Sequence, residues 1–461
     1  MENIKRLAFK ISRDIIDPSF LAPAGENFCP PKINFPFSAD NSRPLPYARI
    51  YRESGENALR SILLIRLGGL GDLLVAYPSI ALIRRVLSSG SGPVLRRSAE
   101  KKQAGRGAEE SQADQSMKGP QTLHPAGERK REFDEAFLPA ALSLACRAEY
   151  GVLLKETGVV DDLLDAGSAP VSGLFGGAGV TTAREGRSVP SPASAYDLVA
   201  GWMQSETTRA DLERFLRTPG GPRVHLMGIR PGSGRLSRFF FDETREFLRR
   251  EGASSFPSFE ECAFLSVPSS WTEEGKKLRP ASGAKFGDAK SDDAKSGDAK
   301  SAGAKSGGIK SGDAKSIEKF AVVHVGSGSR SKRWPLANFI DVVSRLSAAG
   351  VSGTIVSGEA EEDIVPSLRS TALPEGWRWV HQPPLRALAG MIASAGLYLG
   401  NDSGVTHLAA ACGASGAAVF RREFESLWEP YGNIQIISAD DIKNITPAAV
   451  WERCCRISAI I

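Results

Sequence analysis

The stretch LGNDSGVTHLAAACG, residues 399–413, indicates more about the fold than any other part of the chain. An apolar run over residues 395–399 stops at Gly400, small polar residues follow, and an alanine-rich helical pattern comes next. This order predicts a strand, a tight turn and a helix that begins near Asp402 and Ser403. Unpaired backbone N–H groups and the positive end of the helix dipole meet at such a turn, so it favours an anion. Ordinary helix capping by Asp402 and Ser403 is the alternative interpretation.

A second strand and turn pattern is SILLIRLGGLGDLL, residues 61–74. Residues 62–65 form a short apolar run that is typical of a buried parallel strand. Gly68, Gly69 and Gly71 allow the backbone to pass close to a ligand, and Asp72 stands at the start of a helix expected to reach Leu87. The spacing differs from the G-x-G-x-x-G fingerprint, and no convincing acidic residue follows about twenty residues later. Both departures argue against a nucleotide-dependent dehydrogenase.

A third pattern of the same kind is FAVVHVGSGSRSKRWPLANF, residues 320–339. A buried strand leads into a Gly/Ser loop with Arg330, Lys332 and Arg333, and a helix is expected to begin near Pro335. Small hydroxyls, free amides and cations together suit a diphosphate. We assign that contact to Lys332 and interpret the two arginines as solvated charges.

These three segments, in this order, resemble glycosyltransferase family 9, which contains the lipopolysaccharide heptosyltransferases. That family has a Gly-Asp turn after its first strand, an HPGS…KxWP loop, and a turn of the form ND[ST]G followed by a histidine and LAAA. Here the matching segments are GD at 71–72, HVGS at 324–327 with KRWP at 332–335, and NDSGVTH at 401–407. The match is specific over 61–88 and 320–432 and weaker over 150–250. Val325 replaces the usual proline, and Arg421 and Arg422 stand where a Gly-rich turn is usual.

The resemblance implies an α/β protein with two Rossmann-like doubly wound domains that face a cleft, the GT-B arrangement, with disordered insertions. We expect an N-terminal extension (1–59), an acceptor-side domain (60–283) with a flexible insertion at about 91–131, and a nucleotide-sugar-binding domain (317–461). Between the domains, residues 284–316 repeat Ala-Lys-Ser with almost no apolar residues. Such a segment cannot offset the entropy of ordering, which predicts a disordered linker.

The resemblance also implies sugar transfer from a nucleotide-diphosphate sugar, ADP-heptose, to a lipopolysaccharide-core or other cell-envelope glycan acceptor. The reaction would invert the anomeric centre and need no metal and no cofactor besides the nucleotide-sugar. Asp72 would be the general base for the acceptor hydroxyl, and Lys332 would stabilise the departing diphosphate. The glycine turn (Gly68, Gly69, Gly71) would carry the base. The predicted nucleotide-sugar contacts are Ser327, Ser329, Glu361, Glu362, Asp402, Ser403, Gly404 and His407.

Several of these assignments have alternatives. One of Glu361 and Glu362 is expected to bind the ribose hydroxyls, but both are also typical of solvated acids in a first helical turn. His407 is either a structural histidine or a phosphate or sugar contact, and we favour the contact. His324 is interpreted as structural and Trp334 as an anchor of the Lys332 loop. A non-catalytic nucleotide-sugar-binding protein is a further alternative, which the presence of both Asp72 and Lys332 disfavours.

Composition bounds the remaining choices. The 461 residues carry a net charge of +5, and no basic stripe is interleaved with aromatic residues, so no nucleic-acid partner is expected. Six cysteines without metal spacing fit a reduced, cytoplasmic protein. The acidic residues Asp161, Asp162 and Asp165 are interpreted as caps or solvated side chains and not as metal ligands. The stripe of Ile4, Leu7, Ala8, Ile11 and Ile15 either packs on the protein itself or lies on the inner membrane surface.

Periodicity also predicts individual elements. It favours a helix over 132–147, a strand at 197–200, and strands at 320–325, 353–357, 396–399, 416–420 and 434–437. Thr446 and Pro447 predict the start of the last helix. By resemblance, that helix is expected to cross back to the first domain.

Overall fold

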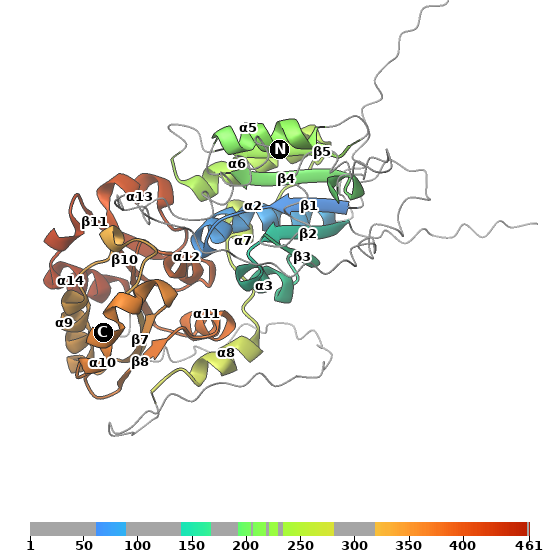
Figure 1. Ribbon diagram of the computed structural model, residues 1–461. Helices are drawn as coiled ribbons and strands as arrows, with labels where there is room; N and C mark the ends of the chain where they lie inside the picture. Colours follow the sequence, from blue (N-terminus) through green and yellow to red (C-terminus); the bar gives the residue numbers. More distant parts are fainter. Residues whose placement is uncertain are drawn as a thin grey trace, which may run out of the picture.

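The computed structural model describes residues 61–88, 140–166, 192–203, 206–217, 221–228, 234–280, 319–458 and 461. The predicted N-terminal extension, the insertion at 91–131 and the Ala-Lys-Ser repeat at 284–316 lie outside the described residues. The described chain forms two parallel sheets, each covered by helices (Figure 1). This arrangement confirms the predicted α/β class with two doubly wound sheets.

The first sheet has the strand order β3-β2-β1-β4-β5 and is parallel throughout. Its order reverses between β1 and β4, which is where open α/β sheets bind ligands. The strands are β1 (Ser61–Ile65), β2 (Ala141–Cys146), β3 (Asp162–Asp165), β4 (Leu198–Met203) and β5 (Arg223–Gly228). The helices on this sheet are α2 (Leu70–Ser88), α3 (Ala148–Glu156), α5 (Glu206–Leu216) and α6 (Leu236–Arg250), and a single turn η2 (Pro192–Ala195) precedes β4.

Two elements of the first sheet differ from the prediction. The helix predicted over 132–147 is wrong, because residues 141–146 form strand β2 beside β1. Leu142 and Leu144 are fully buried there, and small residues between them gave no clear period. Edge strand β5 was not predicted, because its first three residues are only half-buried. Asp161 accepts a hydrogen bond from the Leu142 amide of β2 (2.7 Å) and pairs with Arg84, so its interpretation as a helix cap is wrong.

The second sheet has the order β11-β10-β9-β6-β7-β8 and is also parallel. Its order reverses between β6 and β9. The strands are β6 (Phe320–His324), β7 (Ser352–Ser357), β8 (Trp377–His381), β9 (Leu397–Asn401), β10 (Gly416–Arg421) and β11 (Ile434–Ala439). The helices are α9 (Leu336–Ala348), α10 (Val365–Ser370), α11 (Leu385–Ala393), α12 (Gly404–Ala411), α13 (Arg422–Trp428) and α14 (Pro447–Ile457), with short turns η3 (Arg330–Lys332), η4 (Glu359–Ile364) and η5 (Ile442–Asn444).

The five strands predicted for this sheet are confirmed, whereas edge strand β8 was missed because four of its five residues are only half-buried. Thr446 caps α14 as predicted, since its hydroxyl accepts a hydrogen bond from the Ala449 amide (3.2 Å). The expectation that α14 crosses back to the first domain is wrong. The helix packs on α9 and β10, and its buried residues Val450 and Cys454 belong to the core of the second sheet.

The chain reaches the second sheet before the Ala-Lys-Ser repeat. After α7 (Phe259–Cys262), helix α8 (Ser269–Lys276) packs closely on α11 (Figure 1). A side chain at Gly390 of α11 would overlap the Trp271 backbone, so only glycine permits this approach. Thr354 of β7 donates a hydrogen bond to the Leu278 carbonyl (3.0 Å). Residues 269–280 therefore pack with the second sheet although they precede the repeat, and the predicted boundary at residue 283 stays a prediction.

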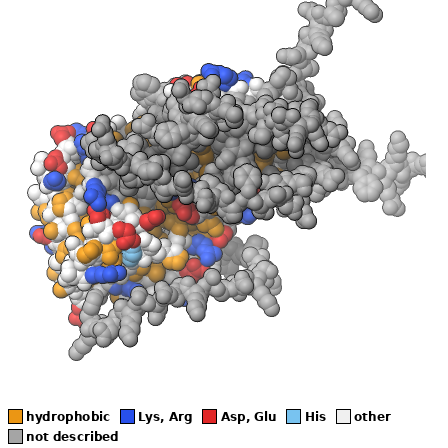
Figure 2. All heavy atoms as spheres, viewed as in Figure 1, with side chains coloured by type: hydrophobic (Ala, Val, Ile, Leu, Met, Phe, Trp, Pro, Cys, Tyr) orange, Lys and Arg blue, Asp and Glu red, His pale blue; other side chains and the backbone are white. Residues whose placement is uncertain are grey.

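The two sheets meet where the start of α2 faces the start of α12 (Figure 1). The Tyr431 hydroxyl donates to the Leu74 carbonyl (3.3 Å) across this junction, and Arg235 pairs with Glu429. On the face seen in Figure 2, the described surface carries acidic and basic side chains side by side without a continuous basic stripe. Within the described ranges, no helix is long and apolar enough to cross a bilayer.

Candidate active site

The turn after β1 brings the Asp72 carboxylate back against its own backbone. Gly68 has a φ of +128°, and a Cβ at this position would overlap the Asp72 side chain. The Gly69 amide donates to Asp72 Oδ2 (2.8 Å), which is one half of a capping box for α2. Helix capping thus accounts for the contact of one carboxylate oxygen, Oδ2. The Asp72 side chain remains 15% exposed.

The other oxygen of Asp72 contacts a residue that was not predicted to belong to the site. Arg66 Nη2 lies 3.0 Å from Asp72 Oδ1, and Arg66 Nε donates to the Asp72 carbonyl (2.8 Å). Arg66 is 1% exposed. The arginine directly follows the apolar run of β1, and a charged residue at the end of a buried strand is the signal that could have drawn attention to it.

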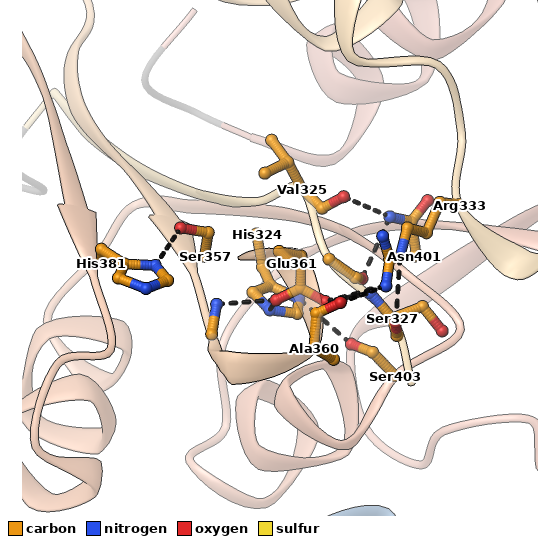
Figure 3. A network of polar contacts seen from close by, with 12 residues as sticks. His324, Val325, Ser327, Arg333, Ser357, Ala360, Glu361, His381, Asn401 and Ser403 are labelled. Atoms are coloured by element: carbon orange, nitrogen blue, oxygen red, sulfur yellow. Dashed lines mark hydrogen bonds and ion pairs between the residues drawn. The ribbon is translucent and has the colours of Figure 1, made fainter. Parts of the chain in front are cut away.

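The turn after β9 begins α12 as the sequence predicts. Ser403 is the N-cap, and its hydroxyl accepts a hydrogen bond from the Thr406 amide (3.4 Å). The Asn401 side chain donates to the carbonyls of Val325 and Gly326 (3.0 and 3.1 Å) and accepts from the Trp334 amide (2.9 Å). These bonds join the turn after β9 to the Gly/Ser loop after β6 (Figure 3).

Lys332 points to that turn from the Gly/Ser loop. Its Nζ lies 3.0 Å from Asp402 Oδ2 and 4.4 Å from the centre of the Phe424 ring. The Asp402 side chain is 6% exposed, and the Lys332 side chain is 23% exposed. Phe424 was not predicted to take part, since an aromatic residue on a short helix carries no distinguishing sequence signal. Trp334 is buried and donates to the Ile445 carbonyl (2.9 Å), so it anchors the loop.

Glu361 lies at the centre of a network that joins two loops (Figure 3). Its carboxylate accepts hydrogen bonds from the amides of Ser327 (3.0 Å) and Gly358 (2.6 Å). A Cβ at Gly326 would overlap this carboxylate, so the glycine is needed for the contact. Burial raises the pKa of Glu361, while the Gly358 hydrogen bond and the charge of Arg333 oppose that shift. The network leaves Glu361 2% exposed.

The two predicted serines of the Gly/Ser loop are engaged within the protein. The Ser327 hydroxyl donates to the Asp402 carbonyl (2.6 Å), and the Ser327 amide donates to the Glu361 carboxylate. The Ser329 hydroxyl contacts the Ser331 hydroxyl (2.9 Å). Both serines are buried. Their contacts fix the loop that carries Lys332.

Glu362 faces solvent, unlike Glu361. Its Oε1 lies 3.0 Å from His381 Nε2 and accepts from the Gln382 side chain (3.1 Å). The Glu362 side chain is 63% exposed. His381 Nδ1 in turn contacts the buried Ser357 hydroxyl (2.9 Å), which fixes the ring (Figure 3).

His407 and His324 are both buried and neutral at pH 7. Burial lowers the pKa of His407 to about 4, with Asp72 opposing and Lys332 adding to the shift. Burial and Arg333 lower the pKa of His324 to about 3, and its Nδ1 lies 3.2 Å from the Ser403 hydroxyl. Nδ1 of His407 has no hydrogen-bond partner among the described residues. A neutral imidazole in this position can bind a ligand through a hydrogen bond but not through charge.

The junction of the two sheets brings the separate turns together. A Cβ on Gly71 would lie 3.2 Å from the His407 ring and 3.3 Å from Gly404 Cα. His407 is also close enough to Asp72 and Lys332 for both charges to act on it. Asp72, Lys332, Asp402, Ser403, Gly404 and His407 therefore gather at one place, whereas Glu361 and Glu362 lie at the carboxyl end of β7. Within the described ranges, no group of three or more His, Cys, Asp or Glu residues is arranged to hold a metal ion.

Comparison with known proteins gives a match to a glycosyltransferase family. Residues 284–450 match the family model "Glycosyltransferase family 9 (heptosyltransferase)". No curated protein matches the chain in sequence.

Among solved structures, a glycosyl transferase family 9 protein from Veillonella parvula DSM 2008 is similar over 87% of this chain and 97% of its own, with a TM-score of 0.53 at 11% identity. The ADP-heptose lipopolysaccharide heptosyltransferase II of E. coli is similar over 86% of this chain and 98% of its own, with a TM-score of 0.50 at 14% identity. At these identities the likeness shows a shared fold. Residues 284–450 thus match a family 9 glycosyltransferase domain, and the described chain shares the fold of these two solved structures.

Proposed function

We propose that this protein transfers a heptose-like sugar from ADP-heptose to a lipopolysaccharide-core or other cell-envelope glycan acceptor. The observation that carries the proposal is the meeting of two helix starts, one with an acid and one with a cation. Asp72 stands at the start of α2, and Lys332 contacts Asp402 beside the start of α12. An acid from one sheet and an anion site from the other suit a reaction that joins two substrates in a cleft.

Asp72 is assigned the role of general base. An acceptor hydroxyl oxygen attacks the anomeric carbon, the bond from that carbon to the diphosphate breaks, and the hydroxyl proton passes to Asp72. The nucleoside diphosphate leaves with the bonding electron pair, and attack opposite the leaving group inverts the anomeric centre. The Asp72 side chain stays 15% exposed at the junction of the two sheets, and this supports the role.

Lys332 is assigned to the leaving diphosphate, together with the amides at the start of α12. Preorganised donors of this kind act where negative charge grows in the transition state. Asp402 would repel a phosphate, so we assign it to orienting Lys332 and to accepting a hydrogen bond from a sugar hydroxyl. His407 is assigned a hydrogen bond to the sugar or phosphate through Nδ1, and its burial with no described partner supports that assignment.

The nucleotide is assigned to the carboxyl ends of β6 and β7. Of the two acids predicted for the ribose, Glu362 is supported better than Glu361, because Glu361 is buried and engaged with backbone amides. Ser327 and Ser329 are then supports of the loop, and their backbone remains a candidate for contact with the phosphates. We keep the division into an acceptor-side domain (60–283) and a nucleotide-sugar domain (317–461) as part of the proposal.

The proposed reaction needs no metal, since Lys332 and the α12 amides supply positive charge for the diphosphate. A cytoplasmic protein is proposed, with or without contact with the inner membrane surface. Residues 4–15, which carry the apolar stripe, lie outside the described residues. No nucleic-acid partner is proposed.

A donor screen followed by a transfer assay tests the function. Purified protein is mixed with ADP-heptose, UDP-glucose, GDP-mannose and the matching free nucleotides, and thermal stabilisation is recorded. ADP-heptose should stabilise the protein most, because a ligand that binds only the folded state raises the melting temperature. Heptose transfer to a lipopolysaccharide that lacks heptose is then followed by mass spectrometry. Binding without transfer to any glycan acceptor would favour the non-catalytic alternative.

A further inference from the structure

Arg66 is a buried cation that the proposed chemistry leaves without a role. It lies directly after β1, and its guanidinium makes three hydrogen bonds to two elements. Nη2 and Nε donate to the carboxylate and the carbonyl of Asp72 (3.0 and 2.8 Å), and Nη1 donates to the Trp202 carbonyl of β4 (2.7 Å). The Phe240 ring lies 5.7 Å from the guanidinium carbon. Arg66 therefore joins the base to β4 where the strand order of the first sheet reverses.

Such a placement is costly for an arginine. Burial lowers the pKa of Arg66, and the Asp72 charge acts against this shift. A buried charge destabilises a fold unless an opposite charge and hydrogen bonds compensate it. The side chains of Arg66 and Asp72 are 0% and 15% exposed, so the cation is inside the protein and the carboxylate reaches the surface of the site.

Capping of α2 does not require this arrangement. The Gly69 amide already occupies Asp72 Oδ2, and a capping contact needs one carboxylate oxygen. Arg66 binds the second oxygen, so that both oxygens are held and rotation of the carboxylate about its Cβ–Cγ bond is restricted. The fork of a guanidinium can make this contact and the two carbonyl contacts together, whereas the ammonium of a lysine cannot reproduce that geometry.

We propose that Arg66 is a positioning residue for sugar transfer, which fixes the orientation of the Asp72 carboxylate that accepts the proton of the acceptor hydroxyl. This inference rests on the proposed function, because it needs Asp72 to be the base. It predicts an effect on turnover without an effect on donor binding, since the donor contacts assigned above lie on the second sheet.

The test compares Arg66→Gln and Arg66→Lys with the wild-type protein. Turnover of ADP-heptose is measured with heptose-free lipopolysaccharide and with water as acceptors, and ADP affinity is measured by calorimetry. Arg66→Gln should lower kcat about 100-fold while the Kd for ADP changes less than about threefold, because a misplaced base slows chemistry without changing the donor site. Arg66→Lys should recover about one tenth of the wild-type kcat, because it restores the charge but not the fork.

Arg84 offers a matched control on the same sheet. It also donates to a backbone carbonyl (Val159, 2.8 Å) and pairs with an aspartate (Asp161, 2.7 Å). Arg84→Gln should lower the melting temperature and leave kcat at the wild-type value. If Arg66→Gln is less stable than the wild type but has the same kcat as Arg84→Gln, the inference is overturned and the proposed function stands.

Two further outcomes are also decisive. If Arg66→Gln does not fold, Arg66→Lys carries the test, and a folded Arg66→Lys with wild-type kcat overturns the inference. A wild-type protein that turns over none of the donors overturns the proposed function, and the Arg66 inference with it.

Discussion

Gly71 and Gly404 meet across the junction of the two sheets: a Cβ on Gly404 would lie 2.9 Å from the Gly71 backbone nitrogen and 3.0 Å from Leu70 Cβ. Both residues lie at the start of a helix, Gly71 in α2 and Gly404 in α12. Asp72 follows the first glycine, and Ser403 precedes the second. This contact therefore sets the distance between the proposed base and the proposed anion site. No side chain larger than that of glycine fits between Gly71 and Gly404.

Gly404→Ala should force the two helix starts apart. The added methyl meets backbone on the other side, which cannot move away as a flexible side chain can. We expect kcat to fall about 10- to 100-fold, because small changes in the separation of reacting groups slow reactions by such factors. Gly350→Ala is the control, since a Cβ there meets nothing within 4 Å, while its φ of +79° makes the substitution strained. It should lower stability and leave kcat unchanged; equal kcat in both variants would contradict the prediction.

Asp72→Ala should abolish transfer and leave donor binding largely intact. Loss of a general base lowers the rate about 100- to 10,000-fold. The variant also leaves Arg66 without its carboxylate, so the melting temperature must be measured beside kcat and ADP affinity. Asp161→Ala is the matched control, because Asp161 also accepts from a backbone amide and pairs with an arginine. Turnover by Asp72→Ala at the level of Asp161→Ala would remove Asp72 from the mechanism.

Lys332→Ala should lower kcat and also weaken donor binding. A cation on the leaving diphosphate acts more strongly in the transition state than in the ground state, and loss of one such donor lowers kcat about 100- to 1,000-fold. Arg330→Ala on the same loop is the control, because the Arg330 side chain is 79% exposed and pairs with Asp363 at the surface. It should change kcat little. A change confined to the KM for the acceptor would assign Lys332 to the other substrate.

Activity should survive excess EDTA, because the proposed phosphate contacts are Lys332 and backbone amides. Transfer is measured before and after overnight dialysis against the chelator, with magnesium and manganese added back separately. Loss on chelation and recovery with one of these ions would show that the diphosphate is bound through a metal.

The sequence predicted the positions where strands end. It did not predict which polar side chains are bonded to other groups of the protein and so are not available to a ligand. The turns at Asp72 and Ser403 lie where the patterns predicted them, since an apolar run followed by glycine and a capping residue has a local cause. Glu361 shows the limit, because only the folded chain brings its carboxylate within hydrogen-bond distance of Ser327, 34 positions earlier in the chain.

Arg66 and strand β2 were missed for related reasons. The partner of Arg66 on β4, Trp202, is 136 positions away, and no local pattern foretells a contact at that separation. Residues 141–146 are mostly Ala and Leu, which favour a helix, and their burial between two neighbouring strands decides the conformation. Tertiary contacts thus override local preference at these positions.

The stability of the protein should fall in mild acid because of its buried histidines. Burial lowers the pKa values of His407 and His225 to about 4 and that of His324 to about 3, against 6.5 for the exposed side chain. The unfolded chain therefore binds more protons than the folded chain in this range, and folding stability rises with pH. The contribution is complete above pH 6.5 and is lost as the pH falls towards 4 for His407 and His225 and towards 3 for His324.

Urea unfolding at pH 7, 6 and 5 measures this effect. Each buried histidine should add about 1.4 kcal/mol per pH unit to the slope of the unfolding free energy below pH 6. His407→Gln and His225→Gln should each flatten the slope to a similar extent. His225 stacks on Phe247 and lies on edge strand β5, which β4 separates from β1, so its substitution should leave turnover unchanged, whereas that of His407 should impair it. Curves for wild type and His407→Gln that stay parallel from pH 7 to 5 would show that His407 is accessible to protons in the folded protein, and its proposed role as a neutral hydrogen-bonding contact would then be wrong.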